Sequence, residues 1–524
     1  MEEKLQNHIS VADAGSESAS DENSKHPSQL IPDLVVDSDE ALNRKMFLVN
    51  NALDEIGFTW YHAKLFLLAG FGYSVDSQLE TIQSSVKTVV DHQFGIDFPI
   101  ATEVFYIGLL VGAVFWGFGA DIIGRKTSFN LSLLLAAVFG LITGGMSSYP
   151  TYCIFMALSA FGAGGNIATD VTVFLEFSPS KFTWLTTLMA AWWGVGQTVA
   201  VLIAWAFVPS FSCPADGECP SSINHGWRYC WYVNSGIVLA LGLARLLFFD
   251  MDESPKYLVS NGRDAEAVET LQGIAKKYNR PCSLTLEDLL DCGEVADAHN
   301  FKTEGYTIKT VSSAVVSHIK VLFSTKKIAY SSTLIFLSWI LIGIAYGTFF
   351  NFVYIYIDLH GGDTSASTFI TYRNSSISQF VGIFGPFVAA YMVRIRWLGR
   401  RGTMAIGAIA TMAILFGYTS VRTQTQDAAF ASMTYFLINI YFACLYAYTP
   451  EVFPAIARAT GGAMGVFLQG GRYLHPHYLL LWPAVRVLGS YLGMWCSHWG
   501  FGVDFHAFTI RTHALPVCLG SATL

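Results

Sequence analysis

Three carboxylates lie within long apolar runs of this chain. Asp76 and Glu80 stand four residues apart in the run 60–82, and Asp170 lies in the run 152–177. Side chains at this spacing share one face of a helix. A carboxylate removed from water normally faces a polar cavity or a partner, and desolvation or a like charge nearby favours its binding a proton. These residues are candidate proton-binding groups, unless Glu80 and Asp170 lie near helix ends and are simply hydrated.

Aromatic and amide side chains occur in the same apolar runs. Aromatic faces bind ring-shaped metabolites, and amides supply hydrogen bonds to them. We therefore expect a solute cavity lined by such residues, and ordinary helix packing is the alternative for each. The candidates are Asn166, Trp192, Trp193, Gln197, Tyr346 and Asn351.

Other kinds of chemistry lack the residues they need. The nine cysteines do not have metal-ligand spacing, and the sequence contains no Gly-x-x-x-x-Gly-Lys-[Ser/Thr] phosphate loop and no convincing Ser-His-Asp set. The net charge of −8, without a notable basic cluster, gives no support for nucleic-acid binding. We expect neither an enzyme nor an ATP-driven pump, and no metal or cofactor.

The elements that position the carboxylates are membrane helices. Of the 524 residues, 52% are hydrophobic and only 13% are charged, whereas a soluble protein has about 25% charged residues. Apolar runs of roughly 20 residues match the thickness of a bilayer. We expect an all-α multi-pass membrane protein with helices over 60–82, 101–120, 127–146, 152–177, 183–209, 229–249, 330–357, 374–393, 402–420 and 429–449.

The chain divides into four parts by composition. Residues 1–57 are polar and Ser-rich and predict a disordered tail. A first six-helix bundle is expected over 58–249, a central loop over 250–327 and a second bundle over 328–524. Basic residues gather in alternate short connections, which places those connections, the tail and the central loop in the cytoplasm.

The connection 210–226 then faces the opposite side, outside the cell. It contains Cys213 and Cys219, which could close a short disulfide in an oxidising compartment. Two free thiols are the alternative.

An internal repeat relates the two bundles. Gly124-Arg125-Lys126 is matched by Gly399-Arg400-Arg401, and 400 − 125 is 275. The run EFSP at 176–179 is matched by EVFP at 451–454, and 451 − 176 is again 275. Two motif pairs at one offset predict two structurally equivalent halves.

The connection 117–126 reads GFGADIIGRK. Gly117 permits close helix approach, Asp121 can cap the loop, and Arg125 and Lys126 hold the cytoplasmic boundary. This pattern resembles the signature loop of the major facilitator superfamily. The runs ESPKYL at 253–258 and PEVFP at 450–454 resemble elements of its sugar-porter branch, and the run 162–177 resembles carriers near the synaptic-vesicle-2-related group, of a type common in fungi.

The resemblance implies a cytoplasmic gate of ion pairs between the bundles. Glu176 would pair with Arg125, and Glu451 and Arg458 would meet Arg400 or Arg401. Breaking and remaking such pairs would bias alternating access, whereas anchoring of helix ends is the plainer alternative. The expected gate residues are Gly117, Asp121, Arg125, Lys126, Glu176, Glu253, Arg400, Arg401, Glu451 and Arg458.

Two departures from the family pattern stand out. The second signature loop has Val393-Arg394 where the family usually has an acid, which predicts a weaker second gate. Beyond about Gly470 the resemblance ends, because polar residues interrupt the windows 458–484 and 504–524 where the last two helices should recur. The last one or two helices are therefore doubtful. A frame change or an unspliced intron would explain this segment, and a divergent terminus is the alternative.

These features predict a proton-coupled secondary transporter that moves a small organic solute, such as a sugar or organic acid, by alternating access. An exporter of a secondary metabolite and a non-transporting receptor or sensor on the same fold are the alternatives. The expected partners are the lipid bilayer, the solute and the proton. We expect a monomer in the cell membrane with its N-terminus in the cytoplasm.

Overall fold

The computed structural model describes residues 40–96, 100–214, 219–248, 252–295, 316–317, 319–359, 367–453 and 457–470, with side chains of 118, 121–123, 167–168, 346–359, 459 and 469–470 outside the description. The described part is built from helices. Residues 471–524, on which the expectation of doubtful final helices falls, lie outside the described residues.

The first half contains six long helical segments. Their order follows the predicted spans, with a short break inside the fifth segment. The helices are α3 (Trp60–Phe94), α4 (Ile100–Ile123), α5 (Arg125–Gly144), α6 (Tyr149–Phe177), α7 (Trp184–Leu188) with α8 (Ala190–Phe211), and α9 (Gly226–Phe248).

The second half repeats this plan as far as it is described. Its helices are α15 (Lys326–Leu359), α16 (Thr368–Gly382) with α17 (Phe384–Arg394), α18 (Gly399–Tyr418), α19 (Gln424–Val452) and α20 (Arg458–Gly470). Within the described residues, nine segments are long and apolar enough to cross a membrane, and α3 and α20 fall outside that set. The two predicted bundles are therefore recognisable as two sets of long helices.

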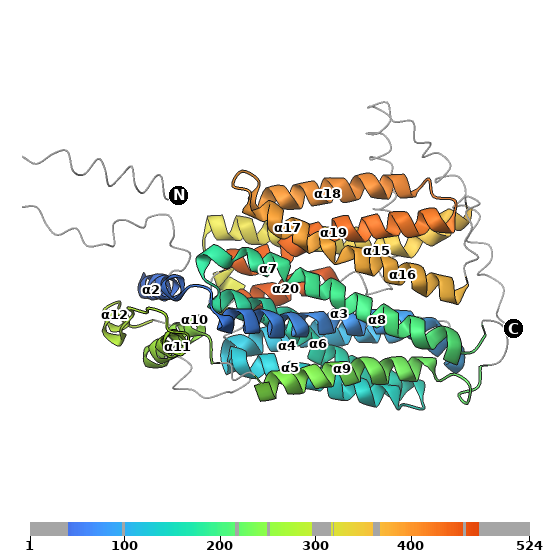
Figure 1. The fold of residues 1–524 in the computed structure, drawn as a ribbon, viewed down its shortest axis with the longest axis horizontal. Coiled ribbons are helices and arrows are strands. Elements are labelled where there is room, and N and C mark those ends of the chain that lie inside the picture. The colour runs from blue at the N-terminus through green and yellow to red at the C-terminus, as the bar shows by residue number, and fades with distance from the viewer. Residues whose placement is uncertain are drawn as a thin grey trace, which may run out of the picture.

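The two halves form two layers with parallel long axes (Figure 1). Contacts between them come from α16 against α8 and from α20 against α4. In Figure 1 α20 lies deep between the layers, beside the helices of the first half. Residues near these seams can therefore respond to movement of one half against the other.

The predicted disordered tail over 1–57 is wrong for its last part. Glu40–Ile56 form helix α2, which buries Leu42, Val49 and Leu53. Apolar residues at spacings of four and seven line one helix face, and burying that face offsets the loss of chain entropy. Residues 1–39 lie outside the described residues.

The central loop also contains helices, and they pack with α2. They are α10 (Pro255–Ser260), α11 (Asp264–Lys277) and α12 (Leu286–Leu290). The Lys45 ammonium lies 2.6 Å from the Asp264 carboxylate, and both side chains are buried. Figure 1 shows α2, α10, α11 and α12 together at one end of the long helices, which we call the α10 end.

Helix α3 is longer than the run 60–82 that predicted it. It continues to Phe94 and ends at Gly95, whose φ of 64° is left-handed and suits glycine. Hydropathy detects only the apolar part. The additional turns carry polar residues that find partners, as where Gln83 Nε2 donates to Thr102 Oγ1 at 2.9 Å.

The break between α16 and α17 has a local cause. Pro386 has no N–H to donate to the carbonyl of Gly382, four residues earlier. That carbonyl instead accepts a hydrogen bond of 3.1 Å from Asn439 Nδ2 on α19. The interrupted helix is thereby fastened to its neighbour.

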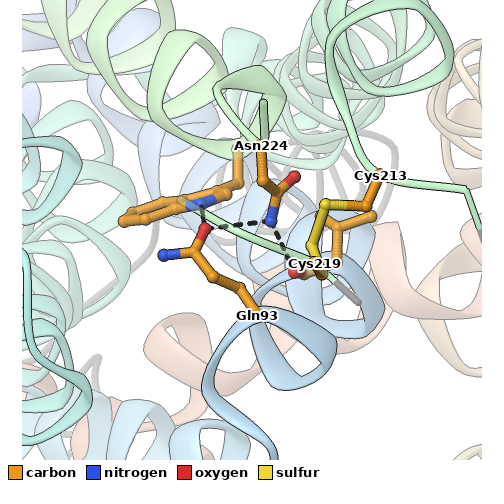
Figure 2. Close-up of a disulfide and its surroundings, with 6 residues drawn as sticks. Gln93, Cys213, Cys219 and Asn224 are labelled. Carbon is orange, nitrogen blue, oxygen red and sulfur yellow. Dashed lines mark hydrogen bonds between the residues drawn. A yellow bond between two sulfur atoms is a disulfide. The ribbon is translucent and has the colours of Figure 1, made fainter. Parts of the chain in front are cut away.

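At the end opposite α10, Cys213 and Cys219 are joined by a disulfide with a Cα–Cα distance of 5.5 Å. Figure 2 shows the hydrogen bonds of the neighbouring Asn224. Its Nδ2 donates to Val89 O at 2.9 Å and to Gln93 Oε1 at 3.0 Å. The structure thus contains the disulfide rather than the two free thiols, and the connection that carries it is tied to the end of α3.

Candidate functional site

Asp76 lies on α3, and its side chain is 3% exposed. Its Oδ2 accepts a hydrogen bond of 2.9 Å from the Trp193 indole on α8. Its Oδ1 is buried and has no hydrogen-bond partner among the described residues. A buried carboxylate with one neutral donor is poorly compensated when ionised, so Asp76 is suited to binding and releasing a proton.

Aromatic rings from both halves pack around Trp193, the hydrogen-bond donor to this carboxylate. The Trp193 ring centroid lies 5.7 Å from that of Tyr446 and 5.8 Å from that of Phe442, both on α19. Tyr446 also contacts Tyr73 of α3 at 5.9 Å and Trp339 of α15 at 4.6 Å. Asp76 is thus one contact removed from the junction of the two halves.

Tyr446 was not predicted from the sequence. The available signal was its spacing of four residues from Phe442, which places both rings on one face of α19. That spacing does not reveal which helix the face meets, so only the fold could assign the pair to Trp193.

Glu80 lies one turn beyond Asp76 and is only partly buried. Its Oε1 accepts a hydrogen bond of 2.6 Å from the Tyr106 hydroxyl on α4. The two predicted acids therefore share α3 but have different environments. A role in proton binding stays a prediction for Glu80.

Asp170 is fully buried in α6 and has a cationic partner. Its Oδ2 lies 3.3 Å from Nη2 of Arg245 on α9, which is 2% exposed. Arg245 was not among the residues predicted from the sequence, although a lone arginine inside the apolar run 229–249 is itself a signal of function or pairing. Asp170 is therefore ion-paired within the first half.

The predicted cavity residues do not form one group. Asn166 Oδ1 accepts a hydrogen bond of 3.2 Å from Ser132 on α5, and Trp192 packs on Phe71 at 4.7 Å. Gln197 is half-buried. Of this set, only Trp193 has a described contact with both Asp76 and the second half. The side chains of Tyr346 and Asn351 lie outside the described residues.

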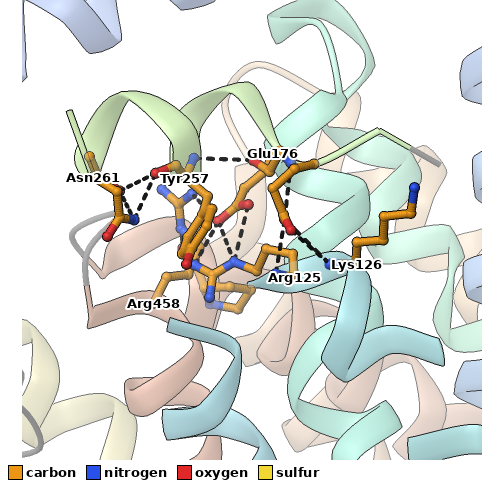
Figure 3. A network of polar contacts seen from close by, with 10 residues as sticks. Arg125, Lys126, Glu176, Tyr257, Asn261 and Arg458 are labelled. Atoms are coloured by element: carbon orange, nitrogen blue, oxygen red, sulfur yellow. Dashed lines mark hydrogen bonds and ion pairs between the residues drawn. The ribbon is translucent and has the colours of Figure 1, made fainter. Parts of the chain in front are cut away.

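A cluster of charges lies at the α10 end of the first half (Figure 3). Nη2 of Arg125 lies 3.0 Å from Oε1 of Glu176, and the two side chains are 2% and 1% exposed. Arg458 of α20 approaches the same Glu176 oxygen at 4.0 Å. We call Arg125, Glu176, Glu253 and Arg458 the N-half charge cluster.

Glu253 covers the start of α5. Its carboxylate accepts hydrogen bonds from the backbone N–H of Arg125 at 2.9 Å and of Lys126 at 3.3 Å. Burial raises the pKa of Glu253 above its usual value, and these N–H donors oppose the rise. A β-carbon at Gly124 would lie 2.6 Å from Glu253 Oε2, and its φ is 105°, so this position requires glycine.

The remaining predicted residues of this loop contribute less. Gly117 is buried in α4, its role in close helix approach stays a prediction, and the Lys126 side chain is exposed. The side chain of Asp121 lies outside the described residues.

The second half has a matching pair. Nε of Arg400 lies 2.5 Å from Oε2 of Glu451, and a second nitrogen, Nη2, contacts Oε1. Arg400 also donates to Thr187 Oγ1 at 2.8 Å and to Thr183 O at 3.1 Å, both in the first half. We call Arg400, Glu451, Thr183 and Thr187 the C-half charge cluster.

Of the two arginines predicted as alternatives, Arg400 contacts Glu451, and Arg401 hydrogen-bonds the Tyr448 hydroxyl at 3.2 Å. The predicted contact of Arg458 with Arg400 or Arg401 is wrong. Arg458 donates to the carbonyl of Pro450 at 2.7 Å and faces Glu176. The reason is that α20 begins at Arg458 and packs against α4 and α6 of the first half.

The residues that reach across to the other half occupy equivalent positions of the repeat. Position 458 minus 275 is 183, so Arg458 and Thr183 are equivalent positions in the two halves. Each follows its own half's glutamate and contacts the other half's charged pair. The two clusters therefore join the halves reciprocally.

Arg394 stands in the second signature loop, where the family usually has an acid. Its guanidinium lies 5.1 Å from the Trp184 ring centroid.

Comparison with known proteins places the chain in a family. The family model described as Major Facilitator Superfamily matches residues 65–474. The chain is 40% identical over 432 residues to the "MFS siderochrome iron transporter 1" of Ceriporiopsis subvermispora, covering 81% of this chain and 82% of that protein. It is 26% identical over 242 residues to the synaptic vesicle 2-related protein of Rattus norvegicus, covering 45% and 41% of the two chains.

A solved structure is similar in fold. The proton:xylose symporter XylE, bound to 6-bromo-6-deoxy-D-glucose, matches with a TM-score of 0.58 at 16% identity, over 82% of this chain and 90% of that one. Its fold and the two-half arrangement agree with the architecture predicted from the repeat. The members of this family are small-solute transporters rather than enzymes. With a family match over most of its length, this chain belongs to the major facilitator superfamily.

Proposed function

We propose that this transporter is a proton-coupled secondary carrier of a small organic solute, with Asp76 as the proton-binding group. The observation that carries the proposal is the Asp76 carboxylate, which is buried, accepts a hydrogen bond from Trp193 at Oδ2, has no hydrogen-bond partner at Oδ1 among the described residues, and lies one contact from Tyr446 of the second half. Glu80 and Asp170 remain candidate accessory acids.

The coupling follows from the cost of an uncompensated charge. An ionised carboxylate with an unpartnered oxygen is expensive in an apolar environment, whereas the protonated acid is not. Loss of the proton would favour a conformation in which water or a solute reaches Asp76. Binding of the proton would favour the packed arrangement of Trp193 against Phe442 and Tyr446. A population shift of this kind is what alternating access requires.

The two charge clusters are proposed as the gate at the α10 end. Each pair lies within one half and reaches a residue of the other half, so separating the halves would break both sets of contacts. Basic residues in the connections at this end support its placement in the cytoplasm, with the N-terminus on the same side and the carrier in the cell membrane. We propose that the carrier works as a monomer.

The test uses purified protein in liposomes with an imposed pH gradient and a pH-sensitive dye inside. The probes are a labelled pentose, a labelled dicarboxylate and a ferric siderochrome, the last because a relative is named as a siderochrome iron transporter. Asp76→Asn should abolish solute-dependent proton movement while counterflow of solute persists. The matched control is Asp91→Asn, because Asp91 lies on the same helix and pairs with Lys87 at 2.6 Å.

The outcomes separate the candidate functions. Proton movement unchanged in Asp76→Asn would remove this residue from coupling. Solute movement outward in exchange for protons would identify the exporter, including an exporter of a secondary metabolite. Binding of a probe without movement in either direction would identify a receptor or sensor.

A further inference from the structure

The ion pair of Asp170 and Arg245 is more elaborate than helix packing needs. Arg245 donates to the carbonyls of Leu68 on α3 and Phe129 on α5, each at 2.7 Å. Its guanidinium carbon lies 3.5 Å from the centroid of the Phe129 ring. One arginine thus connects α9 with α3, α5 and α6. Buried ion pairs contribute little net stability over apolar residues of similar size, so this one calls for another reason.

The pair lies directly against the backbone of α3. A β-carbon on Gly72 would stand 2.0 Å from Arg245 Nη2 and 2.1 Å from Asp170 Oδ2. Glycine at position 72 therefore leaves room for both charged groups where they lie. The pair occupies the space that a side chain at this position would fill.

Asp76 follows Gly72 by one helical turn. Residues four apart share a helix face, about 6 Å apart along the axis, and side chains lean toward the N-terminal end of the helix. The Asp76 carboxylate therefore leans toward the turn that holds the pair. Its charge interacts with those of Asp170 and Glu80.

We propose that Asp170 and Arg245 form a built-in charge partner of Asp76, with Arg245 as the positioning residue that sets the pH at which Asp76 exchanges its proton. This inference rests on the proposed function of Asp76. The ion pair has no net charge. Asp76 can therefore gain or lose its proton without an unpaired positive or negative charge beside it.

Other polar and titratable groups also lie around Asp76. Glu80 and Tyr73 come from α3 itself, and Trp193 comes from α8. Tyr446 of α19 packs against the ring of Tyr73, and the Tyr106 hydroxyl of α4 donates a hydrogen bond to Glu80. Among the described residues named around Asp76, Arg245 is the cationic group, and it is ion-paired with Asp170.

The test is the pH dependence of solute-coupled proton movement in liposomes. Arg245→Gln leaves Asp170 and Asp76 as two neighbouring buried carboxyls without a cation, which together hold a proton to higher pH, so the midpoint should rise by about one pH unit. Asp170→Asn leaves Arg245 positive, and the midpoint should fall by about the same amount. The double variant and Arg245→Lys should both return close to the wild-type midpoint. A purely structural pair would lower activity in both single variants without moving the midpoints in opposite directions, and that result would overturn the inference.

A second measurement covers variants that fold poorly. Asp76→Asn should raise the thermal midpoint of Arg245→Gln protein, because it removes a carboxylate from beside unpaired Asp170. It should lower that of Asp170→Asn protein, because Arg245 loses its remaining acidic neighbour. Equal effects of Asp76→Asn in all backgrounds would contradict the inference. If Asp76→Asn leaves coupling unchanged, the proposed function fails; if it abolishes coupling while the midpoints do not diverge, only this inference fails.

Discussion

The two charge clusters contain the same residue types at equivalent repeat positions, yet their surroundings differ. Arg125 and Glu176 are 2% and 1% exposed, whereas Arg400 and Glu451 are 13% and 20% exposed. The first pair is covered by α10 and Glu253, and Tyr257 of α10 lies 5.5 Å from the Arg125 guanidinium. The second pair is bonded mainly to Thr183 and Thr187.

The same motif, repeated in the two halves, therefore contributes different amounts of free energy to the closed state. Removing one partner of a fully buried ion pair leaves an uncompensated charge and costs about 3–5 kcal/mol, whereas exposed pairs contribute about 0.2–1 kcal/mol. The N-half charge cluster should therefore dominate closure of the α10 end, and the C-half charge cluster should adjust it.

The largest effect is expected from Glu176→Gln. This change leaves Arg125 buried without its acid, and the closed state should lose about 3–5 kcal/mol relative to the open one. The measurement is labelling by a membrane-impermeant maleimide of a cysteine introduced at Thr187, in inside-out vesicles. Labelling should become fast and nearly complete. Labelling as slow as in the parent would refute a gating role for the pair.

Glu451→Gln should have a smaller effect in the same assay. Arg400 keeps its hydrogen bonds to Thr183 and Thr187 and has some access to water. The expected cost is about 1 kcal/mol, or roughly a fivefold change in the population of the closed state. Because position 187 touches Arg400, a second reporter cysteine at exposed Lys126 serves as the control site. An effect as large as that of Glu176→Gln would break the comparison.

Arg458→Gln should change the closed population by less again. Its nearest approach to Glu176 is 4.0 Å, and Glu176 retains Arg125. We expect a threefold change or less, of the size of a weak partly exposed pair. The matched control is Arg401→Gln, since Arg401 bonds Tyr448 rather than the glutamate of either cluster. Equal effects of the two variants would show that Arg458 does not act through Glu176.

Lys256 should make closure depend on pH. Burial and the nearby charge of Arg458 lower the pKa of Lys256 to about 8, from its ordinary value of about 10.4. Because the pKa is lowered in the closed state, the charged lysine destabilises that state by its full free-energy cost below pH 8. This cost disappears as the pH rises from 8 toward 10.5. Maleimide labelling at position 187, divided by that of a cysteine at exposed Lys126 to remove the pH dependence of thiol reactivity, should therefore slow over this range.

Lys256→Met should remove that dependence and favour the closed state at pH 7. Lys277→Met is the control, because Lys277 lies in the last turn of α11 outside both clusters. Persistence of the same pH dependence in Lys256→Met would assign it to another group.

The sequence by itself determined the parts of the protein that local patterning specifies. Apolar runs of membrane length located the long helices, although α3 runs twelve residues beyond its predicted end at 82, because hydropathy does not register polar turns that find partners. The 275-residue offset predicted the two halves, and the family resemblance implied the pairing of Arg125 with Glu176 and of Glu451 with Arg400 or Arg401. These pairs were predictable because their members lie in motifs that resemble those of the family.

Only the tertiary structure decided which helix faces meet. It assigned Arg458 to Glu176, joined Asp170 to Arg245, placed Tyr446 beside Trp193 and packed α2 against the helices of the central loop. Each of these contacts joins residues far apart in sequence, and many partners are equally compatible with the local pattern around either residue. The choice among them depends on how whole helices pack, because a buried charge is tolerated only where the fold brings its partner.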